Sequence, residues 1–251
     1  MCERIQKRVM IGIVSTFSDK GYKEYAQQFV SSLEQFLSKE VEVFLYVDNI
    51  KINTSSNIKT INLESTVPNL TAFKNRNKTK LVTNYRNDGV RFSHKSYAIW
   101  HAAMSINVDN YDSYKLFWLD ADTVLHNYVD SMYFSNLLPN DIFTCFLGRP
   151  GKFTETGFIG FDLKHPAKSI FFDEFIDYYN NDRIYSELPA YTDCHVYDAT
   201  RNKFVEEKKI TTLDLTPGLG KSNFNHVHQG YMIHNKGENK TSSSKKKGKG
   251  K

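Results

Sequence analysis

Residues 115–122 read KLFWLDAD, in which a short apolar run leads directly into two aspartates separated by one alanine. Residues 115–119 have the length and composition of a buried β-strand. Asp120 and Asp122 therefore stand at the carboxyl end of a strand, which is where open α/β sheets bind their ligands. Two carboxylates held this close repel each other unless a cation lies between them. The stretch predicts an α/β fold with a charged binding edge.

The segments before this strand predict a mainly parallel sheet. Residues 9–15 are apolar and rich in β-branched side chains, and residues 22–38 carry apolar side chains at helical spacing. Residues 41–47 read as a second strand, which ends just before Asp48. A β-α-β opening of this kind is typical of doubly wound, Rossmann-like nucleotide-binding sheets.

The rest of the chain is expected to complete the same domain. Residues 51–89 are polar apart from a short strand near 58–63. The remaining predicted elements are helices at 91–104, 167–179 and 193–201 and strands at 141–147 and 157–161. No linker divides residues 1–241, which we expect to form one catalytic domain, whereas the lysine-rich residues 242–251 are expected to be a disordered tail.

The composition is ordinary for a globular protein, with 40% hydrophobic and 24% charged residues. The formal charge of +5 equals the five lysines in residues 245–251, so the remainder is near neutral and a nucleic-acid partner is not expected. No stretch approaches the roughly 20 apolar residues that span a bilayer, and the start reads as a strand rather than a signal peptide. Three cysteines without metal-type spacing predict reduced thiols and a cytoplasmic location.

A hard divalent cation is the expected partner of Asp120 and Asp122. Mn²⁺ or Mg²⁺ suits carboxylate oxygens, can bridge them to a diphosphate, and stabilises negative charge that develops on a departing nucleotide. The alternative interpretation is that Asp122 only caps the following helix.

A second motif, HNKGENK at residues 234–240, supplies complementary groups. His234 offers an imidazole as a third metal ligand, Gly237 permits close approach of the backbone, and Lys240 can meet a phosphate. Two alternatives stay open. His226 or His228 could be the ligand instead, or Lys240 could belong to the basic tail, with His234 a surface histidine.

FWLDADTVL at residues 117–125, the basic helix before it and the downstream HxxGxxK together resemble the GT-A glycosyltransferases. The resemblance is greatest to the family of glycogenin and the bacterial lipooligosaccharide galactosyltransferases, glycosyltransferase family 8. It implies that Asp120, Asp122 and His234 bind the metal and that Gly237 and Lys240 bind the donor diphosphate. It also implies donor contacts by residues matching other binding positions of the family: Ser15, Thr16, Phe17, Asp48, Arg91, Lys95 and Ala121.

Two further stretches match the family less closely. Glu155 and Gly157 lie where the family has an Asn-x-Gly strand start beside the sugar, and Asp193 lies where it has an Asp-Gln pair near the reacting carbon. The resemblance thus makes Asp193 and Glu155 the candidate catalytic residues. Cys194 replaces the glutamine, and Thr241 replaces the aromatic residue that usually follows the final lysine, so the subfamily and the stereochemistry stay open. The alternatives are a helix-capping Asp193 and a simple β-turn at Gly157.

The resemblance implies a metal-dependent glycosyltransferase. Its donor would be a nucleotide-sugar, in this family a UDP-sugar, and its acceptor a hydroxyl group of a glycan, lipid or protein. A haloacid-dehalogenase-type phosphatase with Asp120 as nucleophile is one alternative, although that motif usually ends the first core strand. A nucleotidyltransferase on the same fold is another, although a glycine-rich phosphate loop is missing after the first strand. A non-enzymatic protein that binds through its basic tail would leave the interior motifs unexplained.

Overall fold

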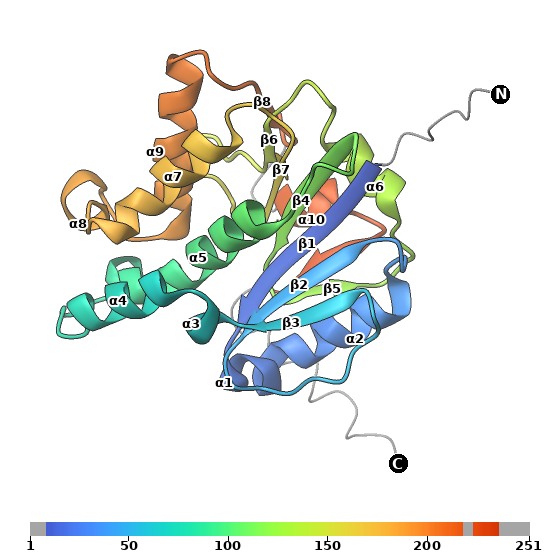
Figure 1. Cartoon of the computed structure of the whole chain (residues 1–251), viewed down its shortest axis with the longest axis horizontal. Helices are drawn as coiled ribbons and strands as arrows, with labels where there is room; N and C mark the ends of the chain where they lie inside the picture. Colours follow the sequence, from blue (N-terminus) through green and yellow to red (C-terminus); the bar gives the residue numbers. More distant parts are fainter. Residues whose placement is uncertain (1–8, 218–222, 236–251) are drawn as a thin grey trace.

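The computed structural model describes residues 9–217 and 223–235 (Figure 1). A seven-stranded sheet in the order β3-β2-β1-β4-β7-β6-β8 forms its centre. The strands are β1 (Val9–Phe17), β2 (Glu42–Val47), β3 (Ile58–Asn62), β4 (Ser113–Leu119), β6 (Thr144–Phe146), β7 (Phe158–Asp162) and β8 (Thr212–Asp214). Strands β3, β2, β1 and β4 are parallel, β7 is antiparallel to both of its neighbours, and β8 is parallel to β6. The predicted α/β fold with a mainly parallel sheet is confirmed.

A second, two-stranded sheet continues the chain beyond the carboxyl end of β4. Strand β5 (Thr123–Leu125) pairs in antiparallel fashion with β9 (Met232–His234), and Thr123 lies opposite His234. This pairing brings His234 beside Asp122, although the two residues are more than a hundred positions apart in the sequence.

Helices cover both faces of the central sheet, and each face has its own hydrophobic core. One face packs against α3 (Leu63–Thr66), α4 (Pro68–Asn77), α5 (Gly89–Ser105), α7 (Lys168–Asn180), α8 (Ile184–Glu187) and α9 (Asp193–Glu206). The other packs against the π-helical turn η1 (Tyr22–Ala26), α2 (Gln27–Phe36), α6 (Ser131–Leu137) and α10 (Asn223–Val227). Two short elements, α1 (Asp19–Gly21) and the 3₁₀ turn η2 (Tyr85–Asn87), follow β1 and precede α5.

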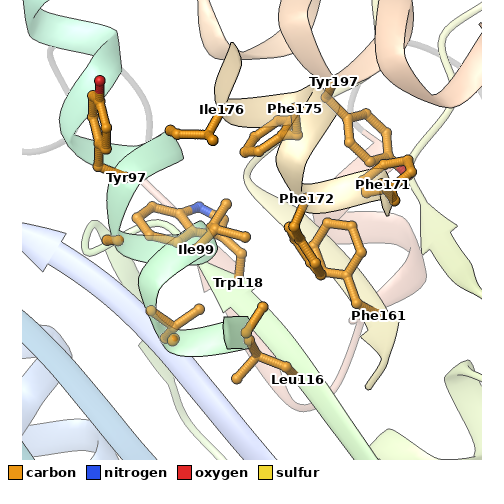
Figure 2. Packing of buried hydrophobic residues seen from close by; sticks show 14 of the residues in the cluster. Tyr97, Ile99, Leu116, Trp118, Phe161, Phe171, Phe172, Phe175, Ile176 and Tyr197 are labelled. Atoms are coloured by element: carbon orange, nitrogen blue, oxygen red, sulfur yellow. The ribbon is translucent and has the colours of Figure 1, made fainter. Parts of the chain in front are cut away.

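Aromatic side chains dominate the first of these cores (Figure 2). Trp118 of β4 and Ile99 of α5 both belong to this core, and Phe161 of β7 packs against Phe172 of α7, with ring centroids 5.1 Å apart. Large aromatic side chains each bury roughly 150–250 Å² and interlock in fixed orientations. The carboxyl end of β4 is therefore anchored by the packing directly below it.

The predicted elements differ from the structure in three respects. The polar region 51–89 contains α4 as well as the expected strand, because Leu70 and Phe73 are enough to bury one face of that helix. The predicted strand at 157–161 runs antiparallel to its neighbours, an orientation that side-chain pattern does not reveal. The element after Asp122 is β5 rather than a helix, so Asp122 does not cap one. Within the described ranges, no helix is both long and apolar enough to cross a bilayer. The predicted tail, residues 242–251, lies outside these ranges.

Candidate functional site

A cleft of about 890 Å³ opens at the carboxyl ends of the central strands. Parallel strands end at a common edge, so side chains that follow β1, β2 and β4 converge there. Most of the residues proposed from sequence line this cleft: Thr16, Phe17, Asp48, Arg91, Lys95, Asp120, Ala121, Asp122, Glu155, Gly157, Asp193 and His234.

Asp120 lies at the centre of the cleft floor. Its backbone N–H donates to the Gly157 carbonyl at 3.1 Å, which extends the β4–β7 pairing by one residue. Its Oδ1 atom accepts hydrogen bonds from Trp118 Nε1 at 2.7 Å and Lys95 Nζ at 3.0 Å. Burial raises the pKa of Asp120, but the charges of Lys95 and His234 outweigh it and lower the pKa to about 2. Asp120 is therefore a carboxylate at any physiological pH.

His234 faces both carboxylates of the DAD motif. Its Nε2 atom lies 2.8 Å from Asp122 Oδ1 and 3.5 Å from Asp120 Oδ2. One ligand atom from each of the three residues fits within 4.8 Å of the others. Burial lowers the pKa of His234, but Asp122, Glu155 and Asp120 outweigh it and raise the pKa to about 9. Two carboxylates and an imidazole form a donor set suited to Mn²⁺ or Mg²⁺.

Gly157 makes room for this cluster. A Cβ atom at Gly157 would lie 2.7 Å from Cε1 of His234 and 3.5 Å from Asp120 Oδ2. Glu155 Oε1 lies 3.7 Å from Nδ1 of the same imidazole. Two residues of the loop before β7 therefore adjoin the histidine ring. Gly157 leaves space for it, and Glu155 places a carboxylate beside it.

A second charged group adjoins the first through Lys95. Its Nζ atom lies 2.9 Å from Asp193 Oδ2 and also donates to the Thr156 carbonyl. The Thr156 hydroxyl donates to the same Asp193 oxygen at 2.6 Å. Burial lowers the pKa of Lys95, yet Asp120 and Asp193 more than compensate and raise it. Thr192 is the N-cap residue of α9, so Asp193 is the first residue of the helix rather than its N-cap, and it lines the cleft.

The structure separates some residues that the sequence grouped with the site. Ser15 does not line the cleft, because it is fully buried and its hydroxyl donates to the Leu119 carbonyl at 2.6 Å. Of the alternative histidines, His226 is exposed, and His228 is buried beside Tyr133, whose hydroxyl lies 2.6 Å from His228 Nδ1. Only His234 of these three belongs to the Asp120–Asp122 cluster. Gly237 and Lys240 lie outside the described residues.

Several cleft residues were missed by sequence reasoning. Trp118 lies two positions before Asp120 on a strand, so its indole was placed to reach the same side, and the alternation of strand side chains could have shown this. Thr156 and Arg149 also line the cleft from loops, and Tyr85 lines it from the short 3₁₀ turn η2. Local sequence gives no signal for where loop side chains meet.

Comparison with known proteins places the fold. No protein-family model and no curated protein sequence matches the chain. Among solved structures, the apo structure of the bifunctional glycosyltransferase WbbM matches 91% of this chain and 46% of its own, with 14% identity and a TM-score of 0.54. Apo mouse xyloside xylosyltransferase 1 matches over 83% of this chain and 85% of its own (9% identity, TM-score 0.49). The apo glycosyltransferase GlyE of Streptococcus pneumoniae TIGR4 matches over 83% and 45% (12% identity, TM-score 0.46). This chain thus spans less than half the length of WbbM, and the likeness to WbbM shows that it has the α/β fold of part of a solved glycosyltransferase.

Proposed function

We propose that this protein is a metal-dependent glycosyltransferase that moves a sugar from a nucleotide-sugar to an acceptor hydroxyl. The convergence of Asp120, Asp122 and His234 in the cleft carries the proposal. Carboxylates from a strand end and an imidazole from a distant strand meet where α/β sheets bind nucleotides. The fold shared with part of WbbM is compatible with this activity.

Asp120, Asp122 and His234 are the residues that would hold the cation, for which we propose Mn²⁺ or Mg²⁺. The residues fit such an ion, because their ligand atoms converge and Gly157 leaves space for the imidazole. When bound, the ion would stabilise the negative charge of the nucleoside diphosphate as it leaves the sugar.

The nucleotide would occupy the part of the cleft that follows β1 and β2. Thr16, Phe17 and Asp48 line this part, and the Phe17 ring stacks on Tyr22 with centroids 5.8 Å apart. We propose that these residues contact the base and ribose of a UDP-sugar. Arg91 and Lys95, one turn apart on α5, would face the phosphates as fixed positive charges. Gly237 and Lys240 remain proposed diphosphate contacts.

In the reaction, the bond between the sugar carbon and the diphosphate oxygen breaks, and a bond forms from that carbon to the acceptor oxygen. The acceptor hydroxyl gives its proton to the departing diphosphate or to water. We propose that Asp193 lies beside the reacting carbon, since Lys95 and Thr156 hold its carboxylate in the cleft. We propose that Glu155 acts indirectly. Its carboxylate lies beside His234 and would hold the imidazole in position.

The same geometry bears on the alternative of a phosphatase. A nucleophilic aspartate needs an oxygen free to attack phosphorus. Both oxygens of Asp120 are engaged, Oδ1 by Trp118 and Lys95 and Oδ2 by the approach of His234. This arrangement favours a structural and metal-binding role for Asp120.

A substrate screen tests the proposal against both alternatives. The protein is incubated with a panel of UDP-sugars and Mn²⁺, and released UDP is measured with and without acceptor sugars. We expect UDP release that stops with a chelator and in Asp122→Asn. Release of pyrophosphate from a nucleoside triphosphate and a sugar phosphate would instead show a nucleotidyltransferase. Release of phosphate from phosphomonoesters alone would show a phosphatase.

A further inference from the structure

The arginines of the described residues fall into two groups. Arg76, Arg183 and Arg201 each have a carboxylate oxygen within 4.0 Å of a guanidinium nitrogen. The ion pairs of the described ranges include none for the other three, Arg86, Arg91 and Arg149. Arg91 and Arg149 line the cleft, and Arg86 directly follows the cleft residue Tyr85. The three arginines without a carboxylate partner are thus all in or next to this cleft.

A backbone hydrogen bond fixes the position of Arg86. Its carbonyl accepts a hydrogen bond from the Tyr191 N–H at 2.8 Å, which ties η2 to the segment leading into α9. Its guanidinium lies 5.8 Å from the ring centre of Tyr85, and its Nε donates to the Tyr85 hydroxyl at 3.1 Å. Tyr191 lies two residues before Asp193, the first residue of α9, so its bond to the Arg86 carbonyl places the backbone of Arg86 beside the start of that helix.

Arg149 is linked to the start of α9 through the loop before β7. Its Nε and Nη2 atoms donate to the carbonyls of Phe153 at 2.6 Å and Thr154 at 3.0 Å. These bonds fix the guanidinium but leave its charge uncompensated. The Phe153 ring packs on His195 with centroids 3.5 Å apart. Both arginines are therefore linked to the start of α9, Arg86 through Tyr191 and Arg149 through Phe153.

The order of the strands shows on which side of the proposed metal site Arg149 lies. Asp48 follows β2, Asp120 follows β4 and Arg149 lies three residues after β6, and these strands stand in the order β2-β1-β4-β7-β6. Strands β2, β4 and β6 run in the same direction, so all three residues lie at one edge of the sheet. The proposed nucleotide end and Arg149 are therefore on opposite sides of the proposed metal site.

We propose that Tyr85, Arg86, Arg149 and Phe153 form an acceptor subsite for a carbohydrate that carries a phosphate or carboxylate group. This inference rests on the proposed transferase function. Arginine presents paired N–H donors that match the oxygens of both anions. Tyr85 and Phe153 are 61% and 40% exposed, and such aromatic faces can pack against the C–H face of a sugar ring. Asp193, between this subsite and the proposed metal site, would lie beside the hydroxyl that is glycosylated.

Matched ligands that differ in one group test the subsite. Binding of glucose 6-phosphate, glucuronic acid and methyl glucoside, and of the corresponding galactose series, is measured by calorimetry in the presence of UDP and Mn²⁺. We expect at least one acidic ligand to bind tenfold or more tightly than its neutral counterpart. Whether the phosphate or the carboxylate ligand binds better distinguishes the two sources of negative charge.

Variants assign the effect to the named side chains. Arg86→Gln and Arg149→Gln should each reduce affinity for the acidic ligand by about tenfold, the scale expected for one charge-assisted hydrogen bond. Arg149→Lys should retain part of it. Lys209→Gln removes one positive charge from the exposed loop after α9 and serves as the matched control, with no loss expected.

The subsite is wrong if neutral and acidic ligands bind equally, if neither series binds, or if both arginine variants keep the preference. Failure of the proposed function has a different signature. In that case no UDP-sugar is turned over and UDP does not bind with Mn²⁺, whatever the acidic ligands do.

Discussion

A Cβ atom on Gly157 would lie 2.7 Å from Cε1 and 2.8 Å from Nδ1 of His234. Real Cβ atoms do not approach neighbouring atoms so closely, so the imidazole can occupy its position only because residue 157 has no side chain. The absence of a side chain at residue 157 thereby leaves room for His234 beside the two aspartates.

Gly157→Ala should displace His234 and weaken Mn²⁺ binding by tenfold or more, because one of three ligands loses its alignment. Calorimetric titration with Mn²⁺ measures the effect. Gly160→Ala is the matched control, since its Cβ would lie 2.5 Å from Phe117 within the core, away from His234. We expect the control to lower the unfolding temperature and to keep its metal affinity. Wild-type Mn²⁺ affinity in Gly157→Ala would contradict the role assigned to this glycine.

Lys95→Met should destabilise the protein by about 3–5 kcal/mol, the scale of removing one partner from a buried ion pair. Lys95 is 11% exposed as a side chain and neutralises both Asp120 and Asp193. Urea unfolding measures the loss. Mn²⁺ should restore part of the stability and stabilise this variant more than the wild type, because the cation supplies the missing positive charge.

Lys203→Met is the control for this change. Lys203 pairs with Glu174 but is 43% exposed, so its loss should cost less than about 1 kcal/mol. Equal destabilisation by both substitutions would contradict the proposal that Lys95 stabilises the fold by neutralising Asp120 and Asp193.

The sheet and the two aspartates of the metal cluster could be predicted from local sequence, and His234 was predicted from its motif and the resemblance to a known family. Strand β4 is buried along its whole length, and its apolar residues 116–119 directly precede Asp120, so the strand, its end and the carboxylates are predicted from one stretch. The place of His234 depends on the pairing of two three-residue strands, which are too short to leave a periodic pattern. The contact between Lys95 and Asp193 joins two helices nearly a hundred residues apart. The separation of these two residues in the sequence does not indicate that their side chains are in contact.

Asp193→Asn should reduce turnover of the nucleotide-sugar by a hundredfold or more while changing UDP affinity less than threefold. A group beside the reacting carbon acts mainly on the transition state, whereas a phosphate contact acts on both states. Steady-state kinetics and UDP titration separate the two quantities. Thr156→Val, which removes the hydroxyl donated to Asp193, should show a smaller loss of turnover in the same direction. If Asp193→Asn unfolds the protein and the folded fraction keeps full turnover, the residue is structural.

The central claim is that Asp120, Asp122 and His234 bind a nucleotide through a divalent cation. Calorimetric titration with UDP, with and without Mn²⁺, tests it most directly in the wild type and in Asp120→Asn, Asp122→Asn and His234→Ala. We predict UDP binding that depends on Mn²⁺ in the wild type, is lost in both aspartate variants, and is weakened at least tenfold in His234→Ala, with partial recovery at high Mn²⁺. A neutral amide is a poorer ligand for a hard cation and leaves the diphosphate charge uncompensated. UDP binding of equal strength with and without Mn²⁺, or unchanged in both aspartate variants, would contradict the account.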